Sequence, residues 1–153
     1  MKIADILSPE RIAVGAKISS KKAVLEELAR LVALANSRLT AAAVFDSLLA
    51  RERLGSTALG SGIAIPHGRL SFQDHTVGAF LRIDKGVDYD AVDNNPVDLF
   101  FALSVPDSAT EEHLQLLATL ARAFSDETLL KNLRSAGSVA AIYDLLIQPA
   151  YAE

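Results

Sequence analysis

The chain has 153 residues, of which half are hydrophobic and none is cysteine, and its formal net charge is −4. This length allows one hydrophobic core but not two, so we expect a single domain over residues 1–153. The absence of cysteine excludes disulfides, thiolate nucleophiles and cysteine-based zinc sites, and the scattered basic residues argue against a nucleic-acid partner.

We expect no export signal at the N-terminus, because Asp5 lies where such a signal needs its apolar centre. The most apolar stretch, 99–105, lies between Asp98 and Pro106. It is far shorter than the roughly 18 apolar residues that a membrane span needs. We therefore expect a cytoplasmic protein with no inserted segment.

Two helices are expected in the first third of the chain. Ser19 and Ser20 are N-cap candidates for a helix that continues to about residue 36, and Thr40 is the N-cap candidate for a helix over about 41–53. In both segments the apolar residues repeat at helical spacing, which indicates one buried face on each helix.

Three apolar runs in the middle of the chain are expected to be strands. The short run 63–65 ends at Pro66, the run 76–83 alternates, and the run 99–105 is apolar on both faces. Such a two-sided apolar run is typical of a central strand. Because proline stops strand pairing and the glycine after His67 permits a turn, we expect His67 at a strand end.

A third long helix is expected after the last strand. Ser108 and Glu111 have the spacing of a capping box. Two shorter helices, over about 126–136 and 138–147, complete the chain, and Pro149 closes the second. The expected apolar stripe of the long helix is Leu114, Leu117, Leu120, Ala121 and Phe124. Helices before, between and after a few strands favour an α/β, three-layer sandwich with helices on both faces of the sheet.

The glycine- and serine-rich stretch 55–62 has the glycine spacing of a phosphate-binding loop. Such a loop needs Lys and then Ser or Thr directly after its second glycine, where this chain has Ser61 and Gly62. The dinucleotide-binding fingerprint fails in the same stretch because its third glycine is missing. The sequence therefore predicts no nucleotide site here.

His67 is the candidate for covalent chemistry. A histidine accepts a phosphoryl group when one ring nitrogen is exposed and a hydrogen bond to the other fixes the tautomer. Pro66 would stiffen the approach, and Gly68 would clear space for a partner's phosphorylated side chain. The alternative is that His67 is an ordinary turn residue, and the local chemistry leaves both interpretations open.

Two further residues fit a phosphoryl site. His113 lies in the first turns of a helix capped by Ser108 or Thr110, where free N–H groups favour an anion; alternatively it is a boundary histidine next to core-facing leucines. Arg51 suits the dispersed charge of a phosphoryl group in transfer, or is simply a cation at a helix C-terminus. Arg53 has the same two interpretations and a weaker claim.

Metal-dependent and hydrolytic sites are less favoured. No two of the three histidines are three or four residues apart, and His75 is expected in an exposed loop. Aspartates cluster between residues 84 and 98, and we interpret them as residues of turns and strand ends. Hydrolysis by a pair of carboxylates stays open as an alternative.

The block 51–68, which begins Arg-Glu-Arg and ends Pro-His-Gly, resembles the active-site signature of the fructose/mannitol-type enzyme IIA of the phosphotransferase system. It is most similar to the nitrogen-related branch, enzyme IIA-Ntr. The likeness covers nearly the whole chain, including 91–99 and 105–113. It implies a mixed β-sheet between helical layers, a bacterial phosphotransferase system component, and no metal or organic cofactor.

The resemblance also implies roles for the three candidates. His67 matches the phosphorylated histidine, with phosphate expected on the tele nitrogen, Nε2. His113 matches the second active-site histidine, which stabilises the phosphoryl group, and Arg51 matches the arginine that stabilises its charge. Mannitol-type members have an acidic residue after the phosphorylated histidine, where this chain has Gly68, and this difference argues against a mannitol carrier.

By the same resemblance, the phosphoryl donor is a phosphohistidine protein similar to HPr, called NPr in the nitrogen branch. The preferred interpretation is a nitrogen-related regulator, with potassium-transport proteins or sensor kinases as its targets. The alternative is a sugar-specific, fructose-type IIA subunit that passes phosphate to a separate IIB. A third possibility is a non-catalytic binding module whose histidines are structural.

Overall fold

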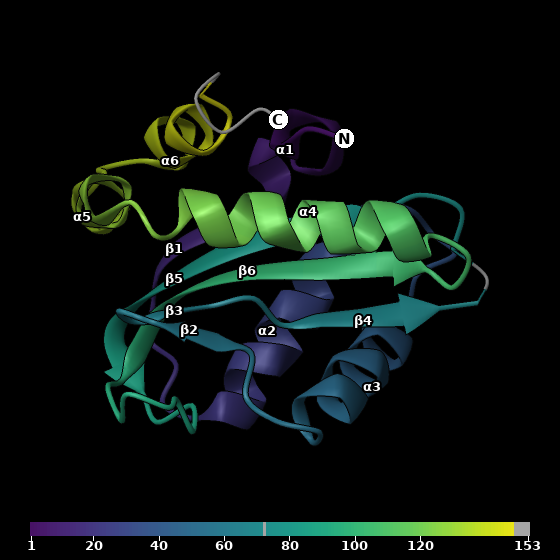
Figure 1. Ribbon diagram of the computed structural model, residues 1–153, viewed down its shortest axis with the longest axis horizontal. Helices are drawn as coiled ribbons and strands as arrows, with labels where there is room; N and C mark the ends of the chain where they lie inside the picture. The colour runs from purple at the N-terminus through teal and green to yellow at the C-terminus, as the bar shows by residue number, and fades with distance from the viewer. Residues whose placement is uncertain (72, 149–153) are drawn as a thin grey trace.

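The computed structural model describes residues 1–71 and 73–148. In this part of the chain a mixed, six-stranded β-sheet lies between two layers of helices (Figure 1). Helices α2 (Lys21–Ala33) and α3 (Ala41–Glu52) cover one face, and α4 (Thr110–Ala123) crosses the other. This is the three-layer α/β sandwich that the sequence predicts.

The sheet is built around β6 (Val97–Pro106), which contains the apolar run 99–105. It pairs antiparallel with β5 (Val77–Val87) on one side. On the other side it pairs parallel with β3 (Ile63–Ala64) and then with β4 (His67–Leu70). Nine of its ten residues are buried because neighbours cover both faces and both edges, which confirms the predicted central strand.

The strands at the two ends of the strand order, β1 and β2, have no clear signal in the sequence. β1 (Ile12–Ala16) pairs parallel with β5, and β2 (Ala58–Gly60) pairs antiparallel with β3. Each contains a glycine with positive φ, +69° at Gly15 and +97° at Gly60. Glycine usually indicates a turn, so strands with these conformations are recognised only once their partners are in place.

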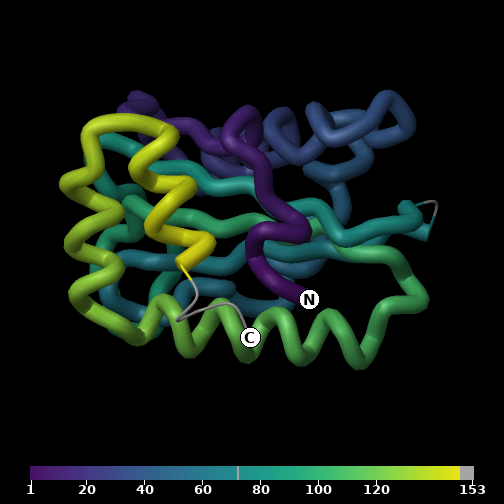
Figure 2. Tube along the Cα trace, turned by 90° about the horizontal axis from the view of Figure 1, so that it is seen from above, coloured from purple at the N-terminus to yellow at the C-terminus, as the bar shows by residue number. Residues whose placement is uncertain are grey.

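Before β1 the chain forms two short helical turns. These are α1 (Ile3–Ile6) and the 3₁₀ turn η1 (Pro9–Arg11). Figures 1 and 2 place α1 on the same side of the sheet as α4 and α6 (Val139–Leu146). Ile3 and Ile6 are buried in the hydrophobic cluster of that side, so the first residues help to close its core.

N-cap side chains begin most of the longer helices. Ser20 Oγ accepts a hydrogen bond from the N–H of Ala23 at 3.1 Å, and Thr40 Oγ1 accepts one from Ala43 at 3.2 Å, which confirms the caps of α2 and α3. Ser138 caps α6 in the same way, and Asp126 caps α5 (Glu127–Ser135). Both short C-terminal helices are therefore confirmed, whereas Pro149 lies outside the described residues.

The predicted start of α4 is wrong. Its N-cap residue is Ala109, which has no side chain to cap the helix, and Thr110 is already helical. Ser108 and Glu111 form no capping box because a turn follows Pro106: the N–H of Ala109 bonds to the carbonyl of Pro106 at 3.2 Å. This turn gives Ala109 a ψ of 56°, outside the extended range that N-cap residues adopt.

The predicted apolar stripe of α4 is also shifted. Of its five members, Leu120 and Phe124 are buried, whereas Leu114 is 59% exposed and Leu117 is half-buried. Leucines at neighbouring positions allow two different stripes, and packing on the sheet selects the one that contains Leu116. The consequence is apolar side chains on the outer surface of α4. The residues of α4 that are buried are His113, Leu116, Thr119, Leu120 and Ala123.

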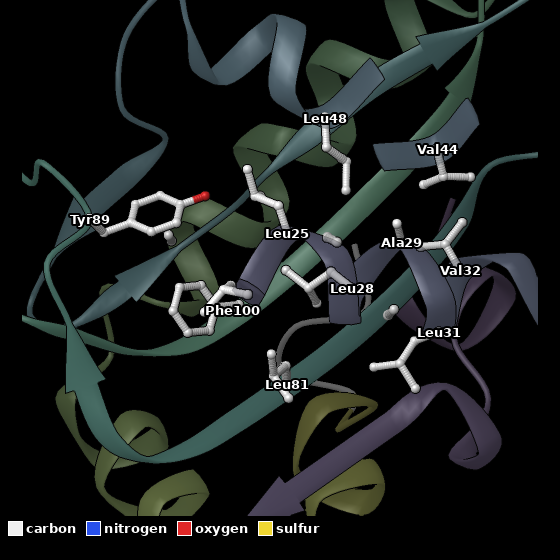
Figure 3. Packing of buried hydrophobic residues seen from close by; sticks show 14 of the residues in the cluster. Leu25, Leu28, Ala29, Leu31, Val32, Val44, Leu48, Leu81, Tyr89 and Phe100 are labelled. Carbon is white, nitrogen blue, oxygen red and sulfur yellow. The ribbon is translucent and has the colours of Figure 1, made fainter. Parts of the chain in front are cut away.

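The core on the α2 and α3 side is mostly apolar. Figure 3 shows Leu25 and Leu28 of α2 packed towards Phe100 of the sheet, with Leu48 of α3 above them. Tyr89 is fully buried at the end of this cluster and brings a hydroxyl group into it. In the described ranges, no helix has the length and hydropathy needed to span a bilayer.

Candidate functional site

His67 is the first residue of β4. Strands β3 and β4 pair with β6 one after the other, and His67 follows the break between them. β3 ends at Ala64, and Pro66 has no N–H to donate. The carbonyl oxygen of Pro66 nevertheless accepts a hydrogen bond from the N–H of Leu103 in β6 at 2.9 Å. His67 therefore begins a strand that continues through Gly68 to Leu70, and the predicted turn at Gly68 after the apolar run is wrong. The backbone is fixed directly before His67.

The ring of His67 is oriented by the backbone. Its Nδ1 lies 2.9 Å from the carbonyl oxygen of Ile65. A carbonyl only accepts hydrogen bonds, so Nδ1 carries the proton and Nε2 keeps the lone pair. Burial lowers the pKa of His67, and the charge of Arg51 lowers it further, while the Ile65 carbonyl opposes them. The ring is therefore neutral near pH 7, with a nucleophilic Nε2.

His113 lies beside His67 and comes from α4, which covers the face of the sheet opposite α2 and α3. It occupies the first turns of α4, and the two ring centroids are 5.2 Å apart. His113 is 6% exposed, and its Nδ1 is buried without a hydrogen-bond partner among the described residues. Burial lowers its pKa to about 4, with His67 and Arg69 contributing. This imidazole is therefore also neutral at pH 7.

Arg51 reaches the site from the last turn of α3. Arg51 and His67 line the same open cavity of about 390 Å³. The Nη1 of Arg51 donates to the carbonyl of Gly55 at 2.9 Å, which leaves other N–H groups of the guanidinium available for a ligand. The structure thus brings together all three residues that the sequence singles out. The rest of the lining is mostly apolar and includes Leu59, Ile65, Leu117, Ala118 and Ala121.

Arg69 is a site residue that the sequence interpretation missed. Residues two apart on a strand point to the same face, so Arg69 and His67 share one face of β4. The Nη1 of Arg69 donates to the carbonyl of Asp107 at 3.2 Å. Its charge contributes to the lowered pKa of both His67 and His113. Arg69 could have been identified from the sequence, because it lies two residues after His67 and residues two apart on a strand share a face.

Gly68 has a different role from the one predicted. It is buried, and a Cβ atom on it would come within 2.8 Å of the backbone of Ser47 in α3. Glycine is thus needed so that α3 can pack closely on β4. The prediction that Gly68 clears space for a partner is wrong, because alternation along the strand turns its free side towards α3 and away from the face of His67.

Glu52 is the second residue that the sequence interpretation missed. It is 5% exposed, and its carboxylate accepts hydrogen bonds from Thr57 and Tyr89. Its Oε2 also lies 3.2 Å from the ammonium nitrogen of Lys21. No local pattern indicates a buried carboxylate at a helix end, since its partners come from segments up to 37 residues away.

The remaining polar candidates lie outside the site. His75 is in an exposed bend, as predicted, and Arg53 is exposed and does not line the cavity. Asp93 accepts backbone hydrogen bonds in its turn, and Asp98 forms an ion pair with Arg134. Over residues 1–71 and 73–148, no group of three or more histidines and carboxylates is arranged to hold a metal ion.

Sequence comparison relates the chain to known proteins over most of its length. The profile of the family described as "Phosphoenolpyruvate-dependent sugar phosphotransferase system, EIIA 2" matches residues 5–148. A protein of Pseudomonas aeruginosa named "Nitrogen regulatory protein" is 45% identical over 147 residues, which are 96% of each chain. The "PTS system fructose-specific EIIA component" of Haloferax volcanii is 37% identical over 106 residues, 69% of each chain.

Comparison with solved structures relates the chain to the same family as the sequence comparison does. The crystal structure of nitrogen regulatory protein IIA-Ntr from Neisseria meningitidis superposes with a TM-score of 0.89 and 42% sequence identity. The superposition covers 94% of this chain and 98% of that one. The similarity therefore extends over the sheet, both helical layers and the segments that carry His67, His113 and Arg51.

Proposed function

Because the chain belongs to the EIIA type 2 family of the phosphoenolpyruvate-dependent sugar phosphotransferase system, we propose that it is a phosphoryl carrier that accepts phosphate on His67 and acts as a nitrogen-related regulator. The observation that carries this proposal is the hydrogen bond between His67 Nδ1 and the carbonyl of Ile65. It leaves the lone pair on Nε2, in a cavity shared with Arg51. The phosphorylated atom is therefore Nε2, the tele nitrogen.

The transfer step follows from this arrangement. The Nε2 lone pair attacks the phosphorus of a phosphohistidine on an HPr- or NPr-like protein; the new N–P bond forms as the bond to the donor's imidazole breaks. The proton on Nδ1 stays in its hydrogen bond to the Ile65 carbonyl. No proton has to leave His67, and the positive charge that develops on its ring stays next to a carbonyl dipole.

Arg51 and His113 stabilise the phosphoryl oxygens in this proposal. The guanidinium of Arg51 has N–H groups beyond the one that bonds to Gly55. His113 is neutral and its buried Nδ1 has no hydrogen-bond partner in the described part of the chain, so the tautomer with the proton on Nε2 avoids an orphaned N–H group. That N–H is the one offered to the phosphoryl group.

The surface around the cavity supports a protein as the donor. Leu54, Leu59 and Leu114 are large apolar side chains that are 83%, 47% and 59% exposed, and Leu59 lines the cavity. They come from the segments that border or line the site: the turn after α3, strand β2 and the first turns of α4. An apolar rim of this kind favours docking of another protein over capture of a small charged ligand.

A sugar-uptake role is the second candidate, and the fructose-specific relative is the observation that favours it. The same His67 chemistry would then deliver phosphate to a sugar-specific IIB protein. The test is to mix the phosphorylated chain with a fructose-type IIB: efficient transfer supports the uptake role, and retention of phosphate supports the regulator. Potassium-transport proteins and sensor kinases remain predicted targets of the regulator.

The carrier proposal is tested by the intact mass of the protein after incubation with phosphoenolpyruvate, enzyme I and HPr or NPr. We expect the wild type to gain one phosphate and His67→Ala to gain none. His75→Ala is the matched control, because this histidine is exposed and outside the site, and it is expected to gain phosphate like the wild type. Phosphate on His67→Ala, or none on the wild type with active donors, would refute the assignment.

A further inference from the structure

We propose that Glu52 is the positioning residue of the site, because its buried carboxylate fixes both the ring of His67 and the turn that holds Arg51. This inference rests on the proposed phosphoryl transfer to His67. Glu52 does not line the cavity and forms no hydrogen bond with His67. Its charge acts on His67 directly and raises the pKa of that ring, whereas its positioning effect is transmitted through the backbone.

The first part of the argument is a chain of hydrogen bonds from Glu52 to His67. Oε2 of Glu52 accepts the N–H of Thr57 at 2.9 Å, and the carbonyl of Thr57 accepts the N–H of Ile65 at 3.0 Å. The carbonyl of Ile65 in turn accepts Nδ1–H of His67 at 2.9 Å. The same group that sets the tautomer of His67 is therefore held in place through Thr57 by the carboxylate.

The second part concerns Arg51 and the turn that follows it. Glu52 is the last residue of α3, and its carboxylate bonds to Thr57 five residues later, which closes a tight loop. Arg51 donates to Gly55 inside this loop. A carboxylate that fixes both ends of the loop thus restricts where the guanidinium can lie.

The third part is the environment of the carboxylate. Oε1 of Glu52 accepts the hydroxyl groups of Thr57 at 2.7 Å and of Tyr89 at 3.1 Å, and Lys21 forms the ion pair with Oε2. All these contacts bring a donor, which is what an ionised carboxylate accepts. Burial raises the pKa of Tyr89, and the neighbouring Glu52 raises it further, so its hydroxyl keeps the proton that it donates.

This arrangement is more elaborate than stability alone requires. Replacing a buried ion pair by apolar residues is often neutral or stabilising, so a buried carboxylate with a cation and three donors is weak evidence for a stability role. Here the hydrogen bonds with Thr57 and Tyr89 lead to a residue that lines the cavity and to a residue that holds its neighbour Ser56. Ser56 adds a further link, because its hydroxyl donates to the carbonyl of Tyr89 at 2.9 Å.

The test compares Glu52→Gln with the wild type in rapid-quench measurements of phosphate transfer at several concentrations of phosphorylated HPr or NPr. Gln keeps the shape of Glu52 but places an amide N–H₂ among donors. We expect the limiting rate to fall about tenfold, because small displacements of reacting groups carry large rate penalties, while the donor concentration at half-maximal rate changes less than about twofold. The apolar docking rim is unchanged by this substitution.

Two variants keep the test decisive if Glu52→Gln folds poorly. Tyr89→Phe and Thr57→Val each remove one hydroxyl donor and leave the carboxylate, and each is expected to slow the limiting rate by about threefold. Ser104→Ala is the matched control. Its hydroxyl makes an equally buried hydrogen bond to Gln73 at 2.6 Å, away from the cavity, and its removal is expected to leave the rate within about twofold of the wild type.

A spectroscopic measurement separates positioning from loss of stability. The ¹⁵N chemical shifts of the His67 ring are expected to report a single tautomer, protonated at Nδ1, in the wild type and in Ser104→Ala. In Glu52→Gln they are expected to move towards a mixture of tautomers. A folded Glu52→Gln protein with wild-type limiting rate and a single tautomer would overturn the inference. Absence of phosphate on the wild type would instead refute the proposed function.

Discussion

The two histidines of the site are held in different ways by the segments that carry them. His67 is fixed by directed hydrogen bonds: its ring bonds to the carbonyl of Ile65, and the two residues before it bond to Thr57 and to β6. His113 is held by packing: among the described residues its Nδ1 has no hydrogen-bond partner, and the N-cap residue of its helix, Ala109, provides no side-chain cap. We therefore call His67 on β4 the anchored histidine, because hydrogen bonds fix it, and His113 on α4 the packed histidine, because burial holds it.

This difference matches the demands of the two roles. A nucleophile needs one tautomer and a fixed direction of attack, which hydrogen bonds supply and packing does not. A stabilising donor needs to be neutral, close and able to follow the phosphoryl group as the bond order changes. Burial keeps His113 neutral and close to His67. Because no side-chain cap fixes the start of its helix, His113 can follow the phosphoryl group as it is transferred.

The sharpest way to break the comparison is to remove the packed histidine. We expect His113→Ala to slow phosphorylation of His67 by about 10–100-fold without abolishing it, because one donor to the phosphoryl oxygens is lost while the nucleophile remains. The rate of phosphate incorporation, followed by intact mass, measures the effect. A rate equal to that of the wild type would exclude His113 from the site, and complete loss would make it as indispensable as His67.

The sequence predicts that the three site residues come together better than it predicts the start of the helix that carries His113. His67, His113 and Arg51 are each identifiable from residue type, position in an expected element and family resemblance, and the structure brings them together. The cap at Ser108 and the inward position of Leu114 are wrong. Both errors have one physical cause: a local pattern allows more than one helix start and face, and only packing against the sheet decides.

The long elements are predicted well and the short edge elements are not. The strand β6 and the helices α2 and α3 have strong periodicity and clear caps, so their existence follows from the sequence. β1 and β2 contain glycines and are strands only because β5 and β3 lie beside them. Glu52 belongs to the same class, because its buried position depends on Lys21 and Tyr89, which are distant in the sequence.

The close packing of α3 against β4, the strand that carries His67, can be tested at Gly68. Gly68→Ala is expected to destabilise the protein by about 2 kcal/mol, because the added Cβ atom would meet the backbone of Ser47, which cannot move as a flexible side chain can. Urea unfolding followed by circular dichroism measures the change in the free energy of unfolding.

Gly137→Ala is the control for this prediction. A Cβ atom at Gly137 would meet nothing within 4 Å, and the residue has no positive φ. It is therefore expected to change the free energy of unfolding by less than about 1 kcal/mol, in the stabilising direction. Equal effects of the two substitutions would contradict the close approach of α3 to β4 that assigns Gly68 its role.

The smallest expected effect concerns His113 and is measured as the pH dependence of the free energy of unfolding. The pKa of His113 is about 4 in the folded protein, below the ordinary value of 6.5 that applies to the unfolded chain. Between these values the unfolded chain binds more protons, so the free energy of unfolding falls as the pH is lowered from 6.5 towards 4 and is unaffected by this group above 6.5. Between pH 7 and 5.5 we expect a loss on the order of 1 kcal/mol, and His113→Gln should remove that part of the pH dependence. Urea unfolding at both pH values measures it. If His113→Gln loses as much stability as the wild type over this interval, His113 is not held neutral by burial, and the contrast between an anchored and a packed histidine fails for His113.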